Sequence, residues 1–203
     1  MTTFVNTPFG ALEGTEQDGV YRFLGVPFAE KPLGELRFRA PQMVRPWTET
    51  RQATGYEKDP MQANLVLGPE HYSEDCLYLN LWVPETTAKK LPVMVWVPGG
   101  AFATGGSGAV DPEGPSIYDC QQLAKDGGCI VVSISYRLNV FGFLNLSQFS
   151  SRFDDNIGMR DIIMALRWVQ EAIASFGGDP ENVTLVGESA GGEAISALLL
   201  IDE

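Results

Sequence analysis

The chain has 203 residues, and its 26 acidic against 14 basic side chains give a formal net charge of −12. This length suits one folded domain or a part of a larger one, and a hydrophobic content of 44% allows a sizeable core. The excess of acidic residues disfavours nucleic acid or an anionic membrane as a partner, because both require clustered lysine and arginine. No apolar stretch is long enough to span a bilayer.

The N-terminus and the cysteines bear on the cellular compartment. Residues 1–10 contain neither a basic residue nor an apolar run, so they do not resemble a secretory signal. Three cysteines, Cys76, Cys120 and Cys129, cannot all pair within the chain, and none stands in a CxxC motif. We therefore expect reduced thiols in a cytoplasmic protein without a transmembrane segment.

The first quarter of the chain predicts a small antiparallel meander followed by an irregular wrapping segment. Residues 4–28 alternate short β-prone pieces with glycines, which is typical of strand–turn–strand structure. Four prolines between residues 27 and 47 forbid regular structure over any length. We expect this second segment to be a surface loop.

Three apolar runs, residues 76–83, 92–97 and 129–136, predict strands buried on both faces. They lack polar alternation, a pattern typical of parallel strands that are covered by helices. A short helix is expected over residues 116–125. A longer helix is expected over residues 159–176, where apolar residues recur every three or four positions.

The last predicted elements are a strand over residues 182–186 and an apolar helix that continues to Ile201. Strand and helix alternate, so the predicted class is α/β, with residues 1–203 as one partial domain that contains no repeat and no linker. The final helix is apolar on nearly every face and should require burial on all sides. The strand before it is expected to become an edge of the sheet.

The most specific motif is the GxSxG sequence Gly187-Glu188-Ser189-Ala190-Gly191, placed between a predicted strand and a predicted helix. A serine on such a tight turn has its hydroxyl exposed at the start of the helix, because the flanking glycines leave room around it. The hydroxyl can attack a carbonyl carbon while the Ala190 N–H binds the developing oxyanion. The alternative interpretation is a glycine-rich turn capped by serine.

A second glycine-rich segment, Pro98-Gly99-Gly100-Ala101-Phe102, follows the predicted strand at residues 92–97. Consecutive glycines let backbone N–H groups approach a substrate oxygen, because no Cβ stands in the way. On its own this segment fits a flexible turn as well as it fits an oxyanion hole.

Five sequence blocks together resemble the N-terminal part of the type-B carboxylesterases, the α/β-hydrolase family that includes the cholinesterases. The blocks are Phe23-Leu24-Gly25-Val26-Pro27-Phe28-Ala29, Glu74-Asp75-Cys76-Leu77-Tyr78-Leu79-Asn80, Val95-Trp96-Val97-Pro98-Gly99-Gly100-Ala101-Phe102, Phe141-Gly142-Phe143-Leu144, and Phe176-Gly177-Gly178-Asp179-Pro180 through Gly187-Glu188-Ser189-Ala190-Gly191-Gly192. The turn at residues 187–191 in the last block is called the elbow. The resemblance implies an α/β-hydrolase fold truncated after the nucleophile elbow, with N-terminal antiparallel strands and then a mostly parallel sheet.

The resemblance also implies roles for individual residues. Ser189 matches the nucleophile that forms the acyl-enzyme, and Glu188 matches a glutamate beside it. Gly99, Gly100 and Ala190 match the oxyanion-hole donors. The implied reaction is hydrolysis of a small-molecule carboxylic ester without metal or organic cofactor.

Two departures from the family pattern stand out. Pro98 occupies the place of a usual histidine, so any hydrogen bonds of that imidazole are lost. The family's counterpart of Cys76 commonly pairs with an upstream cysteine, and this chain has none there. The segment Asp59-Pro60-Met61-Gln62 stands in the expected place of that cysteine.

The catalytic base is also missing from its expected place. In α/β-hydrolases the acid and then the histidine follow the serine, and no histidine follows Ser189 in this chain, whose last residues, Asp202 and Glu203, lie too close in sequence to orient a base. The single histidine, His71, precedes the serine and is interpreted as a surface residue. We expect the acid and histidine in a C-terminal part beyond these residues. The alternatives are an inactive truncated fragment or a noncatalytic esterase-like binding protein.

Overall fold

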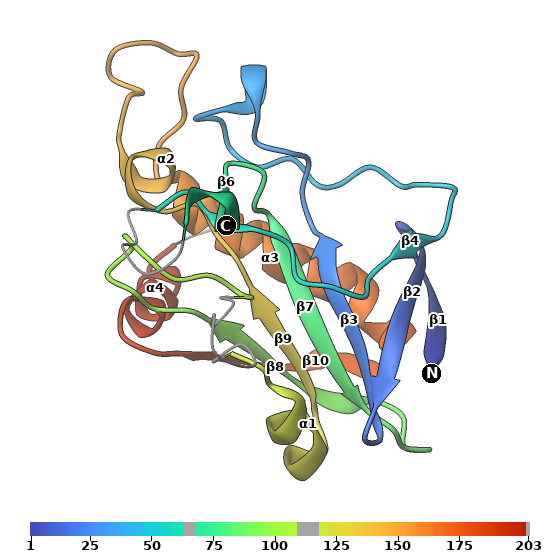
Figure 1. Cartoon of the computed structure of the whole chain (residues 1–203). Coiled ribbons are helices and arrows are strands. Elements are labelled where there is room, and N and C mark those ends of the chain that lie inside the picture. The colour runs from blue at the N-terminus through green and yellow to red at the C-terminus, as the bar shows by residue number, and fades with distance from the viewer. Residues whose placement is uncertain (63–67, 109–117, 202–203) are drawn as a thin grey trace.

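The computed structural model describes residues 1–62, 68–108 and 118–201. An eight-stranded mixed sheet forms the centre of the molecule, in the order β1-β2-β3-β7-β9-β8-β10 with β4 beside β2 (Figure 1). The strands are β1 (Thr2–Thr7), β2 (Gly10–Gln17), β3 (Val20–Pro27), β4 (Arg51–Gln52), β5 (Asp59–Pro60), β6 (Tyr72–Ser73), β7 (Tyr78–Pro84), β8 (Leu91–Val97), β9 (Ile130–Ile134) and β10 (Gly178–Gly187). The helices are α1 (Gln121–Gly127), α2 (Asn139–Phe143), α3 (Ile157–Ala172) and α4 (Ala190–Leu198), with 3₁₀ turns η1 (Gly34–Leu36), η2 (Pro69–His71) and η3 (Ile173–Phe176).

The first half of the sheet is antiparallel. The predicted meander is confirmed, since β1 pairs with β2 and β2 with β3, both antiparallel. The expectation that the run at residues 76–83 forms a parallel strand is wrong, because β7 is antiparallel to both β3 and β9. Its side chains are buried on both faces because it is central in the sheet, and burial alone does not determine strand direction.

The second half of the sheet is parallel and carries the elements of the site. β8 pairs in parallel with β9 on one side and with β10 on the other. Both β8 and β10 therefore end at the same edge of the sheet, where the glycine-rich segment and the elbow follow them. As expected for the strand at residues 182–186, β10 is the last strand in the described sheet.

Helices cover both faces of the sheet. On one face α3 packs through residues such as Ile162 and Trp168 onto the inward side chains of β7, β8 and β9. On the other face α1 covers Trp82 and Val131 with Ala124. The helix predicted over residues 116–125 starts later than expected, because residues 118–120 are not helical and α1 begins at Gln121; residues 116 and 117 lie outside the described residues. No helix in the described ranges is long and apolar enough to cross a membrane.

The proline-rich segment is more than the surface loop that its sequence predicts. Phe28, Ala29 and Val44 are buried in the main core, and a β-bridge joins Ala29 to Met43. The prolines prevent extended sheet pairing but leave the side chains between them free to pack. The segment thus closes one side of the core while its backbone remains irregular.

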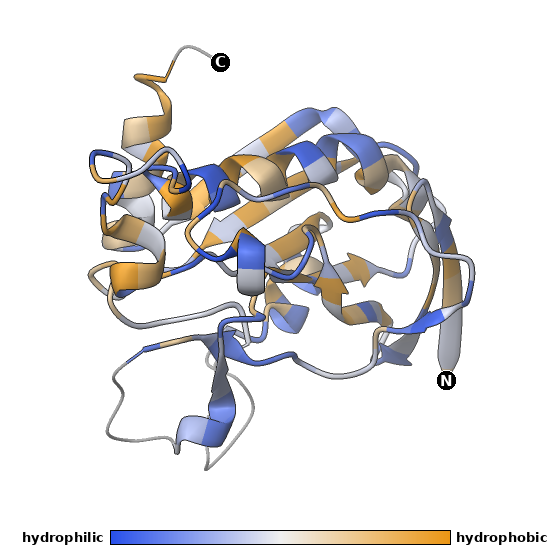
Figure 2. Cartoon of the chain, turned by 90° about the horizontal axis from the view of Figure 1, so that it is seen from above, coloured by the Kyte–Doolittle hydropathy of each residue, from blue (hydrophilic) through white to orange (hydrophobic). Residues whose placement is uncertain are grey.

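The final helix is covered on one side. Ala190 and Ala194 of α4 are buried, whereas Leu199 and Leu200 just beyond it are 85% and 86% exposed. Figure 2 shows this C-terminal end as a hydrophobic segment that projects from the body of the molecule. Within residues 190–201 the burial on all sides that the sequence predicts is not realised, because no described element packs on the outer face. Asp202 and Glu203 lie outside the described residues.

Candidate active site at the carboxyl ends of β8 and β10

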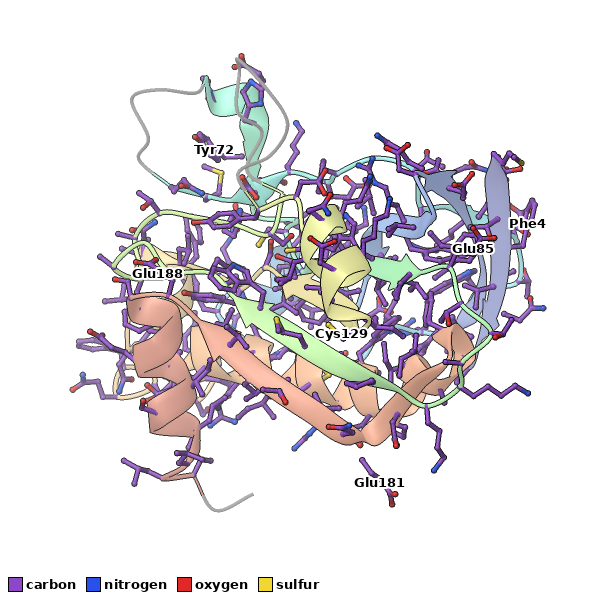
Figure 3. The ribbon with its side chains drawn as sticks, turned by 90° about the horizontal axis from the view of Figure 1, so that it is seen from below. Phe4, Tyr72, Glu85, Cys129, Glu181 and Glu188 are labelled. Atoms are coloured by element: carbon purple, nitrogen blue, oxygen red, sulfur yellow. The ribbon has the colours of Figure 1, made fainter. Side chains whose placement is uncertain are left out.

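The GxSxG motif forms a strand-to-helix turn. β10 ends at Gly187 and α4 begins at Ala190, so Glu188 and Ser189 make the turn between them (Figure 3). Ser189 has φ 51° and ψ −123°, a conformation that costs free energy for a residue with a side chain. The side chain is exposed, and Ser189 Oγ makes no hydrogen bond to any residue in the described ranges. The turn therefore presents an unencumbered hydroxyl at the start of a helix.

The glycines of the elbow are required by close backbone approaches. A Cβ on Gly187 would lie 2.5 Å from the carbonyl carbon of Gly191. A Cβ on Gly191 would lie 2.0 Å from the carbonyl oxygen of Val97, at the end of β8. The helix can start this close to the strands only because neither position carries a side chain.

The segment after β8 turns back on itself through several left-handed residues. Gly100 and Gly105 have φ values of 110° and 104°, and Ala101 and Phe102 have φ values of 55° and 56°. The carbonyl of Gly100 accepts hydrogen bonds from the N–H groups of Ala103 and Thr104, both at 2.9 Å. We call residues 99–105 the glycine loop.

The glycine loop and the elbow touch. A Cβ on Gly99 would lie 2.5 Å from the carbonyl oxygen of Glu188 and 3.1 Å from Ser189 Cβ. The N–H groups of Gly99, Gly100 and Ala190 have no acceptor within the described part of the chain. The structure thus places Gly99 and Ala190 beside Ser189, with Gly100 next in the same loop, and the family resemblance implies that these three residues are oxyanion donors.

Glu188 lies against the same loop, between the end of β10 and the start of α4, and is labelled in Figure 3. Its Oε2 would meet a Cβ on Gly99 at 2.5 Å, so the carboxylate packs directly over that glycine. The pKa of Tyr118 is raised chiefly by burial and further by the negative charges of Glu188 and Asp59. The neighbourhood of the elbow therefore carries negative potential.

Pro98 leads into the glycine loop and is anchored by a tyrosine. The hydroxyl of Tyr136 donates a hydrogen bond of 2.8 Å to the carbonyl of Pro98. Burial raises the pKa of Tyr136 to about 12, so the hydroxyl stays protonated and remains a donor at neutral pH. Because proline has no N–H and no polar side chain, the loop depends on groups from other segments.

The 59–62 segment provides contacts that sequence reasoning did not assign to the site. The Gln62 carboxamide donates a hydrogen bond to the carbonyl of Gly105 and accepts one from its N–H. The Asp59 carboxyl packs on Gly106 and accepts the N–H of Gly108. Burial raises the pKa of Asp59 to about 7, because the single N–H donor does not offset the loss of water. The only signal in the sequence was the position of this segment in place of a cysteine.

Other candidates are not brought to Ser189. His71 lies in η2, where its Nε2 is 3.7 Å from a carboxylate oxygen of Glu70, and no described contact joins it to Ser189. Cys76, Cys120 and Cys129 are free and buried. Within the described ranges, no group of three or more His, Cys, Asp or Glu side chains could hold a metal ion.

In sequence and in fold the chain is similar to several known esterases. The chain is 45% identical over 200 residues to the para-nitrobenzyl esterase of Bacillus subtilis (strain 168). This alignment covers 96% of the chain and 40% of that esterase. It is 44% identical over 205 residues to the liver carboxylesterase of Sus scrofa, with coverage of 94% and 34%.

Solved structures agree with these relatives. A PNB esterase superposes with a TM-score of 0.89 at 45% identity, covering 98% of this chain and 40% of that one. A carboxylesterase of Geobacillus stearothermophilus gives a TM-score of 0.87 at 44% identity, covering 97% and 40%. The chain thus spans 34% to 40% of the length of these relatives. The model of the carboxylesterase family matches all of residues 1–203, and the chain belongs to this family.

Proposed function

We propose that the chain carries the nucleophilic half of a serine esterase, which hydrolyses small-molecule carboxylic esters through an acyl-enzyme on Ser189. The observation that carries the proposal is the contact between the elbow and the glycine loop. The exposed Ser189 hydroxyl, which makes no described hydrogen bond, lies next to Gly99, and the N–H groups of Gly99, Gly100 and Ala190 have no acceptor within the described residues.

In the first step Ser189 Oγ attacks the ester carbonyl carbon. The hydroxyl proton passes to a histidine, and the carbonyl oxygen becomes an oxyanion bound by the N–H groups of Gly99, Gly100 and Ala190. The tetrahedral intermediate collapses, and the histidine returns the proton to the departing alcohol. Water then attacks the acyl-enzyme in the same way and releases the carboxylic acid and free Ser189.

The acid and the histidine of this scheme are proposed to come from polypeptide beyond the 203 residues. Two observations support this. The chain spans 34% to 40% of the length of these esterase relatives. Within the described ranges, no histidine contacts Ser189, since the single histidine of the chain, His71, pairs with Glu70.

The 203-residue chain alone should keep a small Ser189-dependent reactivity, because the turn and the N–H donors remain when the base is absent. Triad enzymes without a member retain a rate about 10³–10⁴-fold over water. We expect slow modification of Ser189 by a fluorophosphonate probe, in which Oγ bonds to phosphorus and fluoride leaves. Imidazole should accelerate this reaction by taking the proton. Intact-protein mass and peptide mapping provide the readout.

Ser196 supplies the matched control, because it is an exposed serine on the same helix. Ser189→Ala should abolish both the slow and the imidazole-stimulated labelling, whereas Ser196→Ala should label like the wild type. A folded wild-type chain whose Ser189 reacts no faster than Ser196 would contradict the proposal and favour a noncatalytic role.

A further inference from the structure

The glycine loop holds a backbone conformation that its own sequence does not favour. Ala101 and Phe102 are consecutive residues with side chains and φ values of 55° and 56°. Left-handed conformations are unfavourable for such residues and persist only when surrounding contacts impose them. Within the loop, the carbonyl of Gly100 accepts the N–H groups of Ala103 and Thr104, and groups outside the loop add further contacts.

Gln62 is the first of these groups. Its Nε2 donates to the carbonyl of Gly105 at 2.7 Å and to the carbonyl of Pro60 at 3.1 Å. Its Oε1 accepts the N–H of Gly105 at 2.9 Å. One half-buried carboxamide thus satisfies both backbone groups of Gly105, the residue that closes the glycine loop.

Asn139 is the second group and reaches the loop from the start of α2. Its N–H donates to the carbonyl of Phe102 at 2.9 Å, and its Nδ2 donates to the carbonyl of Ala103 at 2.9 Å. The same Nδ2 donates to the carbonyl of Met61 at 3.1 Å, beside Gln62. Asn139 therefore ties the left-handed residues to the 59–62 segment.

The chemistry requires amides at both positions. Each NH₂ group faces two backbone carbonyls, and a carboxylate in its place would put negative charge against oxygen atoms without a donor. Asn139 itself has φ 53°, which asparagine, aspartate and glycine tolerate best. Replacement by aspartate or glycine therefore changes the hydrogen bonds while the backbone preference is kept.

We propose that Gln62 and Asn139 are positioning residues of the esterase reaction. Their carboxamides hold the glycine loop in the left-handed conformation that directs its N–H groups at the oxyanion. This inference rests on the proposed function. It places the determinants of the oxyanion site in two segments distant in sequence from the nucleophile, and it gives them the holding role that Pro98 cannot fill.

The test distinguishes an effect on the glycine loop from an effect on the stability of the whole fold. Gln62→Glu, Asn139→Asp and Asn139→Gly are compared with the wild type in labelling of the 203-residue chain by the fluorophosphonate probe. The maximal labelling rate should fall about 10-fold to 100-fold, because removal of one oxyanion donor costs about 10²–10³-fold. The half-saturating probe concentration should change less than about twofold. Hydrogen exchange should show faster exchange at the N–H groups of Ala103, Thr104 and Gly105.

Two other amides serve as matched controls. Gln170 donates to one backbone carbonyl, that of Pro180, at 2.8 Å and lies outside the loop. Asn156 has φ 47° before α3, so Asn156→Gly repeats the backbone change of Asn139→Gly elsewhere. Gln170→Glu and Asn156→Gly should label at the wild-type rate and leave exchange in the loop unchanged.

The outcomes distinguish this inference from the proposed function. Wild-type exchange in the loop of all three variants overturns the inference, whatever the labelling. Faster exchange with an unchanged labelling rate overturns it as well, because the contacts would then be structural only. A wild-type chain with an ordered loop and an unreactive Ser189 overturns the proposed function, and with it the inference.

Discussion

Two glycine-rich turns face each other in the candidate site, and they are held in different ways. The elbow is fixed by backbone contacts among its own glycines and with β8, where Gly191 meets the carbonyl of Val97. The glycine loop is held by hydrogen bonds from other segments, chiefly those of Gln62 and Asn139. Ser189, the proposed nucleophile, is thus positioned by steric exclusion, and the loop by polar contacts that can be removed one at a time.

The largest effect is expected from Gly191→Ala, which tests the steric side of this comparison. The new methyl group would lie 2.0 Å from the Val97 carbonyl oxygen, and its nearest neighbours are all backbone atoms of Val97 and Pro98, which cannot turn aside as a side chain can. We expect the free energy of unfolding to fall by about 4 kcal/mol, together with loss of Ser189 labelling. Urea denaturation followed by circular dichroism measures the first quantity.

The neighbouring glycine is the control for this prediction. A Cβ on Gly192 would lie 3.3 Å from the carbonyl oxygen of Gly187 at the end of β10, a contact that a shift of a few tenths of an ångström relieves. Gly192→Ala should therefore cost less than about 1 kcal/mol, because alanine favours helix. Equal losses in both variants would show that the elbow does not depend on the close approach at Gly191.

Asp59 tests the polar side of the comparison through pH. Its pKa rises from 3.8 in the unfolded chain to about 7 in the folded protein. Between these values the folded protein binds more protons than the unfolded chain, so this contribution to the free energy of unfolding falls as the pH rises from about 4 to about 7 and is constant above. The full loss is about 2 to 4 kcal/mol.

Asp59→Asn should remove this dependence, because the amide carries no charge at any pH. At pH 8 the variant should be more stable than the wild type, and at pH 4 the two should be close. Asp126 is an exposed residue of α1, so Asp126→Asn should show the same change of unfolding free energy with pH as the wild type. The free energy of unfolding is measured by denaturation from pH 4 to pH 8. If it changes with pH by the same amount in Asp59→Asn and in the wild type, Asp59 does not carry a buried charge.

The smallest effect is expected at Ala101, where it sharpens the description of the loop as strained. Ala101→Gly should raise the free energy of unfolding by roughly 0.5–1 kcal/mol, because glycine adopts φ 55° without a steric cost. The nearby, exposed Ala103 has no positive φ, so Ala103→Gly should lower the free energy of unfolding slightly. Thermal melting of the two variants compares them directly, and destabilisation by both would show that the loop stores no strain at Ala101.

The sequence predicted much of this architecture and the strand-to-helix turn that carries Ser189, for identifiable reasons. The apolar run before Gly187 and the periodic apolar residues of α3 are local signals, and both elements form where they were expected. The direction of β7 was predicted wrongly, because a run of apolar residues reports burial, while direction depends on which strands lie beside it.

The residues that hold the glycine loop could not be predicted for a different reason. Gln62 and Asn139 are joined to the loop over separations of 43 and 36 residues, and neither stands in a motif that indicates a role. Polar contacts over such separations depend on the folded backbone, which periodicity does not describe. The elbow was predictable because all of its parts are contiguous in the sequence.

The strained backbone of Ser189 has an evolutionary consequence. A residue at φ 51° and ψ −123° imposes a standing cost on the fold that glycine would avoid. Ser189→Gly would make the protein more stable and remove its hydroxyl in a single step. In a lineage that no longer required the hydroxyl, drift towards greater stability would favour that change. Under the proposed function, the serine at this turn is kept for its hydroxyl at the expense of stability.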